Sequence, residues 1–381
     1  MTTASTEETR EPDLLYTRTE EELRAAVRSL IADRCDAPAV LARAESGTPY
    51  DPRLWTPLAA GIGAAGLLVP EELGGQGAGH REAAVVLEEL GRGVVPAPYL
   101  TSAVVATETL LALPAQDGPV AGLLEDLATG RRVAVLAVPF SAGPFAAGPG
   151  AALPVGGPLG TPEGTVTGVA DAPAADVLLV PAADGLYAVE TGSDEVAVEP
   201  VVPLDLTRPL ATVTLERSAG TRLADGVSSA AAVHRGLLAG AGLLASEQLG
   251  IAEWCLAETV RHTRERHQFN RPIGSFQALK HRMAHLWLEV VSARAAARNA
   301  ADALATGSPD TPLAVAVAQA YCSKAAVRAA EECVQLHGGI GMTWEHPAHL
   351  YLKRAKADSL AYGTAGHHRA SLAGLVELPA P

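Results

Sequence analysis

The sequence predicts a three-part fold in which helical N-terminal and C-terminal regions flank a middle domain of β-strands. Helical periodicity recurs through the first third of the 381-residue chain, valine-rich runs broken by Gly, Pro and Asp fill the middle, and alanine- and leucine-rich segments follow. We place the domains at residues 1–128, 129–222 and 223–381. This order of helices, strands and helices indicates separately packed units rather than a doubly wound sheet.

The N-terminal region is expected to contain three amphipathic helices. Apolar residues recur at three- and four-residue spacing from Thr19 to Ile31 and from Asp51 to Leu68. The segment Val69 to Gly77 (VPEELGGQG) is rich in glycine and is predicted to be a loop. Helical periodicity returns from His80 to Gly93, where glycine ends the helix.

The middle and C-terminal regions differ in amino-acid composition and in hydrophobic pattern. Between residues 132 and 216 the runs VAVLAV, VLLVPA, GLYAVE and ATVTLE predict strands, and the Gly-, Pro- and Ala-rich stretch from Ser141 to Gly160 predicts a long loop. Few breakers interrupt the chain from Ser228 to Thr306, and helical patterns follow from Leu313 to His337 and from Pro347 to Ala361. Long helices packed as a bundle account for this pattern.

Composition excludes several classes of protein. The net charge is −14 and the sequence pI is near 5.2, and no dense basic run is present, which argues against a nucleic-acid partner. The polar, acidic N-terminus does not resemble a signal peptide, and we expect no membrane span. The four cysteines lack CxxC spacing, which favours a reduced, cytoplasmic protein without a zinc site or disulfide framework. They are Cys35, Cys255, Cys322 and Cys333.

Three segments resemble the acyl-CoA dehydrogenase family. They are Arg264 to His281 (RERHQFNRPIGSFQALKH), Gln335 to Ala357 (QLHGGIGMTWEHPAHLYLKRAKA), and VPEELGGQG followed by LEELGRG. The resemblance implies a middle β-barrel or sandwich domain and a C-terminal four-helix bundle. It also implies an FAD enzyme that oxidises an acyl-CoA thioester to the trans-2-enoyl-CoA and passes electrons to an electron-transfer flavoprotein. Fatty-acyl or sterol side-chain substrates of β-oxidation are expected.

The first segment carries a guanidinium and an aromatic ring three residues apart. On one helix end such a pair can grip a pyrophosphate and an adenine together. The resemblance assigns Arg266 and Phe269 to the ADP half of an FAD that belongs to a neighbouring subunit.

The second segment and the residues after it supply the other expected FAD contacts. The resemblance places Gln335, Gly338 and Gly339 where the backbone approaches the same ADP group, since glycine leaves room for close approach. Thr364 completes the set of expected cofactor contacts. We expect His337 to be a structural histidine.

The sequence departs from the family at the catalytic base. The family removes the α-proton of the thioester with a glutamate that usually precedes a Gly-Thr pair, and here Tyr362 stands at that position. With a reference pKa of about 10, tyrosine is a poor base at neutral pH. Other members place the glutamate 26 residues before the arginine that Arg266 matches, which is Gly240 in this chain. Glu247 lies roughly 10 Å further along the same helix and is a weak candidate.

A second departure lies in the middle domain. The family usually has a Thr-Glu-Pro-Gly-like loop that contacts the flavin ring, but Pro139 to Gly150 reads PFSAGPFAAGPG. The chain thus keeps the ADP-binding set and lacks the ring-binding loop and the base. This division predicts an α2β2 heterotetramer with a base-bearing paralogous subunit, similar to heteromeric actinobacterial acyl-CoA dehydrogenases that shorten sterol side chains.

Three other functions remain open at this point. The chain could be a self-sufficient homotetramer that uses Glu247, a flavin-dependent oxidase or hydroxylase on the same fold, or a structural subunit without chemistry of its own. Lys353, Arg354 and Lys356 form a basic cluster that either meets a phosphate or covers a solvated helix face.

Overall fold

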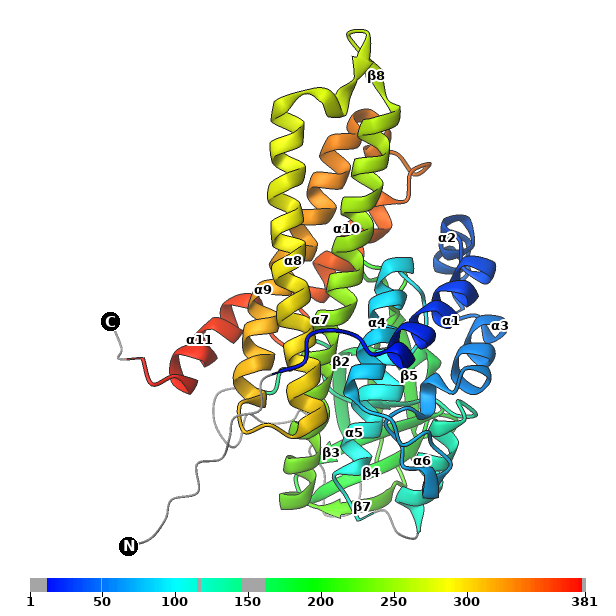
Figure 1. The fold of residues 1–381 in the computed structure, drawn as a ribbon. Helices are drawn as coiled ribbons and strands as arrows, with labels where there is room; N and C mark the ends of the chain where they lie inside the picture. The colour runs from blue at the N-terminus through cyan, green and yellow to red at the C-terminus, as the bar shows by residue number, and fades with distance from the viewer. Residues whose placement is uncertain (1–11, 49, 115–117, 146–161, 379–381) are drawn as a thin grey trace, which may run out of the picture.

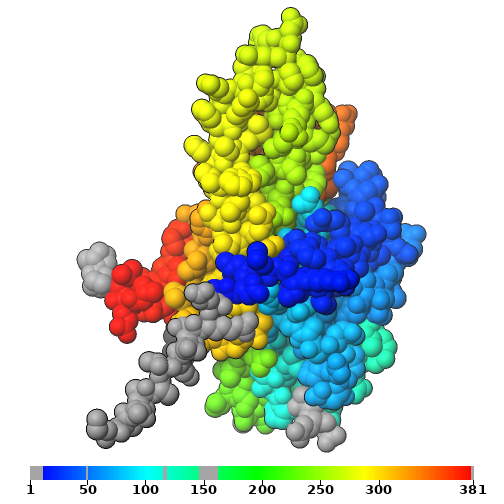
Figure 2. Space-filling view, viewed as in Figure 1, coloured from blue at the N-terminus to red at the C-terminus, as the bar shows by residue number. Residues whose placement is uncertain are grey.

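The computed structural model describes residues 12–48, 50–114, 118–145 and 162–378. Its helical N-terminal region packs beside a β-rich region, and a tall helical bundle rises beyond both (Figure 1). The predicted order of helices, strands and helices is therefore confirmed. The upper half of the bundle projects away from the rest of the molecule, as the space-filling view also makes clear (Figure 2).

Helix α1 (Arg18–Arg34) contains the helix predicted from Thr19 to Ile31. It begins with a capping box in which the Thr17 hydroxyl accepts a hydrogen bond from the Glu20 backbone N–H at 3.2 Å. The Glu20 carboxylate accepts the reciprocal bond from the Thr17 backbone N–H. This cap fixes the start of the helix, whose apolar face packs into the main core.

The segment predicted as one helix from Asp51 to Leu68 is divided into short turns, and that prediction is wrong. The helix α3 (Pro52–Thr56) continues into a π-turn, η1 (Pro57–Gly61), and a 3-10 turn, η2 (Ala64–Gly66), follows. The break falls at Gly63, whose φ of +80° lies in the left-handed region. Glycine adopts that conformation without the steric cost that a Cβ would add.

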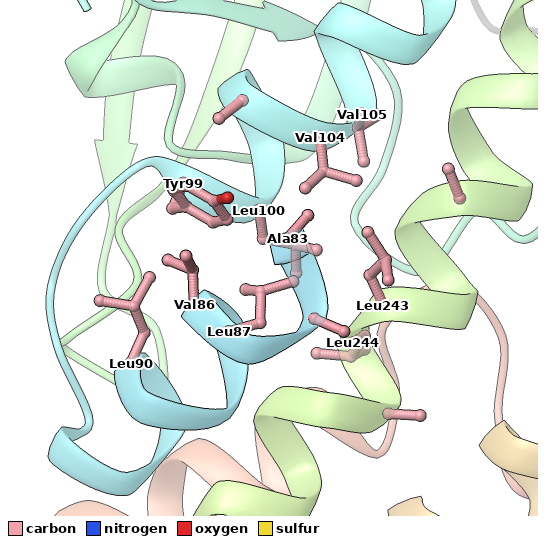
Figure 3. Packing of buried hydrophobic residues seen from close by; sticks show 14 of the residues in the cluster. Ala83, Val86, Leu87, Leu90, Tyr99, Leu100, Val104, Val105, Leu243 and Leu244 are labelled. Atoms are coloured by element: carbon pink, nitrogen blue, oxygen red, sulfur yellow. The ribbon is translucent and has the colours of Figure 1, made fainter. Parts of the chain in front are cut away.

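Helix α4 (His80–Gly93) is the central helix of the N-terminal region and matches its predicted bounds. It packs with a mainly π-helical segment, η4 (Tyr99–Ala106), and with the first bundle helix in one continuous core (Figure 3). The sequence patterns did not predict η4 or three of the neighbouring helices. The remaining elements here are α2 (Ala37–Glu45), η3 (Glu71–Leu73), α5 (Thr107–Leu111) and α6 (Pro119–Ala128).

The middle domain consists of two sheets that pack face to face. One has the strand order β1-β3-β4-β7 and the other β2-β6-β5, and a separate apolar core with residues from both fills the space between them. Strands β1 and β3 are parallel, whereas the other pairs of these sheets are antiparallel. The strands are β1 (Ala134–Leu136), β2 (Gly164–Ala170), β3 (Val177–Ala182), β4 (Gly185–Glu190), β5 (Val196–Val201), β6 (Leu210–Leu215) and β7 (Thr221–Asp225).

The four predicted valine-rich runs correspond to β1, β3, β4 and β6. The predicted loop from Ser141 to Gly160 lies mostly outside the described residues. Its first part, residues 141–145, contains neither helix nor strand.

The C-terminal bundle is built on α7, α8 and α9, with the shorter α10 packed against α9 and α7. At 40 residues α7 is about 60 Å long. A two-stranded hairpin joins α7 to α8 at the tip of the bundle, and α11 packs against α9 and extends away from the side of the bundle (Figure 1). The elements are α7 (Gly226–Glu265), β8 (His267–Gln268), β9 (Arg271–Pro272), η6 (Ile273–Ser275), α8 (Gln277–Thr306), α9 (Thr311–His337), η7 (Gly338–Met342), α10 (Ala348–Asp358) and α11 (Ala365–Leu375).

Two glycines let α4 and α7 approach each other closely. A Cβ on Gly250 of α7 would lie 1.9 Å from the backbone oxygen of Glu88, and a Cβ on Gly91 of α4 would lie 2.1 Å from the backbone oxygen of Glu247. The backbones of α4 and α7 cannot move apart here without disturbing their packing, so these two positions accept no larger side chain. The contact joins the N-terminal region to the bundle.

Helix α7 is long and apolar enough to cross a membrane by length and composition. Its most apolar stretch is 61% buried within the protein, where it packs against α4, α8 and α9. These contacts are those of a core helix in a bundle.

Candidate functional site

Arg266 and Phe269 lie at the tip of the bundle, on a hairpin. Helix α7 ends at Glu265, and Arg266 already has extended backbone, with φ −74° and ψ 120°. Phe269 and Asn270 form the two-residue turn with φ values of +54° and +58°, the left-handed pair that suits a tight hairpin. The expectation that both residues share one helix end is therefore wrong.

Both side chains at the tip are free to meet a group from outside the chain. Phe269 is 86% exposed, and its ring packs edge-on against Phe276, with the ring centroids 6.1 Å apart. Arg266 is exposed, and its guanidinium has no hydrogen bond or ion pair within the part of the chain that the structure describes.

Gln335, Gly338 and Gly339 lie at the same end of the bundle as Arg266. The ring of His337, at the end of α9, lies 4.2 Å from the ring of His262, which precedes Arg266 by one helical turn on α7. Gln335 and both glycines are exposed. A Cβ on either glycine would meet nothing within 4 Å, so the space beside them is open.

Thr364 lies apart from this tip, at the N-terminus of α11 beside the middle of α9. Its hydroxyl accepts a hydrogen bond from the His367 backbone N–H at 3.2 Å. It lines a cavity of about 710 Å³ between α9 and α11, whose charged lining residues are Lys324, Arg328, Arg369, Glu289 and Glu331. Within one chain, Thr364 and the hairpin therefore do not form a single site.

The two positions at which the family places its base meet at one point. The Tyr362 ring lies against α7, and a Cβ on Gly240 would be only 3.2 Å from its Cζ. The Tyr362 backbone N–H donates to the Phe140 carbonyl at 2.8 Å, and its own carbonyl accepts from His368 Nε2 at 3.0 Å. One aromatic ring thus fills the place of either glutamate.

The rings of Phe140 and Tyr362 close the space around that point. They pack edge-to-face with centroids 5.4 Å apart. The cavity beside them measures about 20 Å³, which holds about one water molecule. Burial raises the pKa of Tyr362, so its hydroxyl stays protonated at neutral pH and cannot remove a proton.

A larger cavity of about 410 Å³ lies on another side of Phe140. It opens between the middle domain and α10, and Thr167, Gly168, Arg208 and Leu360 belong to its mostly apolar lining. Neither Gly240 nor Tyr362 lines it.

Glu247, the weak candidate for the base, lies in a buried ion-pair network. Its carboxylate accepts two hydrogen bonds from Arg208, at 2.7 and 2.9 Å, and one from Arg354 at 2.6 Å. Burial by itself would raise the pKa of Glu247, but the two guanidinium groups outweigh it and lower the pKa. A carboxylate held by two arginines is a poor proton acceptor, so the structure argues against Glu247 as the base.

The same network includes two further acids. Arg208 also pairs with Asp358 at 2.7 Å, and Arg354 donates to Asp205. Burial, followed by the charge of Glu247, raises the pKa of Asp358. The network joins the loop between β5 and β6 to α7 and α10, and so fixes the middle domain on the bundle.

Arg354 corrects the expectation of a basic cluster on a solvated helix face. Only 2% of Arg354 is exposed, whereas Lys356 pairs with Glu331 at the surface. Arg354 and Asp358 are four residues apart in the sequence. On a helix this spacing places both side chains on one face, and it was the one local feature of the network visible in the sequence. Arg208 carried no such signal, because its partners lie 39 and 150 residues away.

Asp171 is a buried acid that the sequence patterns did not single out. It accepts a hydrogen bond from the Thr101 hydroxyl at 2.7 Å, and burial, partly offset by Arg208, raises its pKa to about 6. Its φ of +55° places it in the left-handed region that Asp and Asn tolerate.

The fold and the signature segments define an acyl-CoA dehydrogenase. The chain belongs to this family of oxidoreductases: its residues 230–375 match the acyl-CoA dehydrogenase C-terminal domain, and residues 17–118 match the N-terminal domain. Members of the family bind FAD.

Among individual proteins, the chain is similar to the acyl-CoA dehydrogenase IpdE2 of Mycobacterium tuberculosis. The two are 38% identical over 338 residues, which cover 88% of this chain and 91% of IpdE2. A chain of the ChsE4-ChsE5 complex from Mycobacterium tuberculosis has the same fold, with 28% identity, a TM-score of 0.82, and coverage of 97% and 100% of the two chains. The Tcur3481-Tcur3483 steroid ACAD G363A variant gives 28% identity and a TM-score of 0.83, with coverage of 94% and 98%.

Proposed function

We propose that this chain is the base-lacking subunit of a heteromeric, FAD-dependent acyl-CoA dehydrogenase. In this α2β2 assembly it supplies the ADP-binding half of a composite FAD site, and a paralogous subunit supplies the base. The assembly oxidises an acyl-CoA thioester to its trans-2-enoyl product and passes the electrons to an electron-transfer flavoprotein.

The observation that carries the proposal is the filling of the base position by Tyr362. The ring is buried against Gly240 and Phe140, and the remaining cavity of about 20 Å³ leaves no room for an acyl chain. A chain that can neither hold a base nor admit a thioester at this point must obtain both from a partner.

The residues at the bundle tip fit the ADP half of FAD. Arg266 offers an unpaired guanidinium suited to a pyrophosphate, and Phe269 offers an exposed ring suited to stacking. The open space beside Gly338 and Gly339 allows a close approach to their backbone N–H groups. Because Thr364 lies beside the middle of α9 and α8, away from the tip, a complete site in this arrangement requires a second subunit.

The division of labour follows from these positions. FAD supplies the hydride acceptor for the β-carbon of the substrate. This chain's Arg266 neutralises the pyrophosphate charge, Phe269 covers the adenine, and Gln335 with the two glycines orients the ADP group. The proton on the α-carbon goes to the partner's base.

The relatives support both the heteromeric state and a steroid-derived substrate. The ChsE4-ChsE5 structure is a complex of two different chains, and the Tcur3481-Tcur3483 enzyme is described as a steroid ACAD. We extend these descriptions to this chain as part of the proposal, and assign it to the β-oxidation of a sterol-derived or fatty acyl-CoA.

One observation favours an alternative in which the chain holds its own flavin ring. The cavity of about 410 Å³ beside Phe140 lies between the middle domain and α10 and has a mostly apolar lining. A homotetramer with one FAD per chain would use it. This alternative still lacks a base, since Glu247 is bound by two arginines.

The test is FAD stoichiometry in the lone chain and in the co-expressed complex. The proposal expects one FAD per heterodimer, little in the lone chain, and dehydrogenase turnover only in the complex. Arg266→Ala should lower the FAD content of the complex several-fold without changing its mass by light scattering.

Arg264→Ala is the matched control, because Arg264 is also exposed and lies on the last turn of α7. It should leave the FAD content unchanged. One FAD per chain in an active homotetramer would overturn the proposal, and unchanged FAD in the Arg266→Ala complex would remove the role given to the bundle tip.

A further inference from the structure

Three potential metal ligands converge near the tip of the bundle, from three segments of the chain. Glu258 lies on α7, His337 ends α9, and His346 lies between η7 and α10. Glu258 Oε1 is 3.7 Å from His337 Nε2 and 3.5 Å from His346 Nε2. All three ligand atoms lie within 4.8 Å of one another.

The tautomer of neutral His337 points a lone pair at this cluster. Its Nδ1–H donates to the Cys333 carbonyl at 2.6 Å, so in the neutral ring Nε2 carries no proton. The His337 side chain is completely buried, and its Nε2 has no hydrogen-bond partner within the described residues. A backbone carbonyl that holds the second nitrogen is the usual outer contact of a metal-binding histidine.

Two of the three ligand separations are close to those around a tetrahedral zinc ion. Zinc binds His nitrogen and carboxylate oxygen at about 2.0–2.2 Å, which places neighbouring ligand atoms of a tetrahedron roughly 3.3–3.6 Å apart. The separations of 3.5 and 3.7 Å from Glu258 Oε1 lie in or close to that range, and the two His Nε2 atoms are at most 4.8 Å apart. Two histidines and a glutamate form one of the ligand sets that zinc uses, with a fourth position for water.

Two existing contacts must adjust around a bound ion. Arg261 donates to both oxygens of Glu258, with its Nε 2.9 Å from Oε2. It is 56% exposed and already pairs with Glu265 at 2.6 Å, so it can keep Oε2 and release Oε1. His346 Nδ1 accepts a long hydrogen bond of 3.3 Å from the Ala348 backbone N–H. This hydrogen bond is lost when Nε2 of His346 binds the metal.

We propose that Glu258, His337 and His346 bind one divalent cation of the zinc class. The ion ties the end of α7 to the end of α9 and to the segment before α10. Arg266 directly follows the end of α7 and Gln335 lies on the last turn of α9, so the site also fixes the distance between the two segments at the tip. The binding of the ion does not depend on the proposed FAD chemistry.

The full chain, alone and in its complex, is stripped with a chelator and then titrated with Zn²⁺ and Co²⁺. We expect one equivalent of zinc by mass spectrometry of the metal content, a visible absorption band typical of tetrahedral Co²⁺, and a rise in Tm on addition of zinc. His346→Ala should weaken binding by more than about tenfold.

His281→Ala is the matched control, because His281 is exposed at the start of α8 and belongs to no such cluster among the described residues. It should bind metal like the natural chain. His346→Ala keeps the buried His337 in place, and circular dichroism checks that this variant is folded. Less than a tenth of an equivalent in the natural chain, or unchanged binding in folded His346→Ala, would overturn the proposal.

Discussion

Gly240 and Tyr362 are in contact: a Cβ on the glycine would lie 3.2 Å from Cζ of the tyrosine ring. The family can place its catalytic glutamate at either position, and the two are 122 residues apart in this chain. The absence of a side chain at Gly240 makes room for the ring at Tyr362. The two departures from the family are therefore one packing arrangement, and the predictions below follow from it and from the groups around it.

Tyr362→Phe should leave the turnover of the assembled dehydrogenase within about twofold of the natural complex. The pKa of the hydroxyl is raised by burial, so it does not act as a base, and the ring that fills the space is kept. A base removed from its site typically costs about 10²-fold or more in rate. Steady-state kinetics at saturating substrate measure the difference, and a loss of that size would make Tyr362 catalytic.

Glu247→Gln should lower the stability of the protein, and it should not remove a catalytic group. The change removes the negative charge between two buried arginines, Arg208 and Arg354, and breaking a buried ion pair in this way costs on the order of 3–5 kcal/mol. Chemical denaturation measures the free energy of unfolding.

Glu253→Gln on the same helix is the control for that experiment. Glu253 pairs with the part-exposed Arg294 and Arg92, so the loss of its charge should cost less, about 1 kcal/mol. Full stability of Glu247→Gln with abolished turnover would instead support Glu247 as the base.

Asp171→Asn should reduce the dependence of the free energy of unfolding on pH. The folded pKa of Asp171 is raised to about 6 from an ordinary value of 3.8, so the folded state binds this proton more tightly than the unfolded state. The bound proton stabilises the folded protein fully at pH values below 3.8. This stabilisation is lost as the pH rises through about 6. The difference between these two pKa values corresponds to about 3 kcal/mol.

The measurement is the difference in unfolding free energy between the natural chain and Asp171→Asn from pH 4 to 7. Relative to the natural chain, the variant should gain stability as pH rises across this window. Asparagine tolerates the φ of +55° and can still accept from Thr101, so the backbone is preserved. A difference that stays constant with pH would contradict the raised pKa.

Gly250→Ala should loosen the contact between α4 and α7. The new Cβ would lie 1.9 Å from the Glu88 carbonyl oxygen, and overpacking of this kind costs roughly 1–3 kcal/mol or more. Gly122→Ala on α6 is the control, because nothing lies within 4 Å of its Cβ and alanine favours a helix by up to about 1 kcal/mol. Thermal unfolding should therefore move Tm in opposite directions for the two variants.

The sequence alone determined the order of the domains and the family. Helical periodicity located α1 and α4, valine-rich runs located four strands, and the two C-terminal segments identified an acyl-CoA dehydrogenase. These features depend on residues close together in the chain, so their patterns can be recognised without coordinates. The missing glutamate at Tyr362 was equally visible as a single substitution in a motif.

Only the tertiary structure decided what replaces the base and what Glu247 does. Arg208 and Arg354 reach Glu247 across 39 and 107 residues, and no periodicity links positions so far apart. Tyr362 meets Gly240 only because α7 packs against the segment that precedes α11. A buried charge and a filled cavity depend on which surfaces pack together, so their physical role becomes defined once the helices and sheets are assembled.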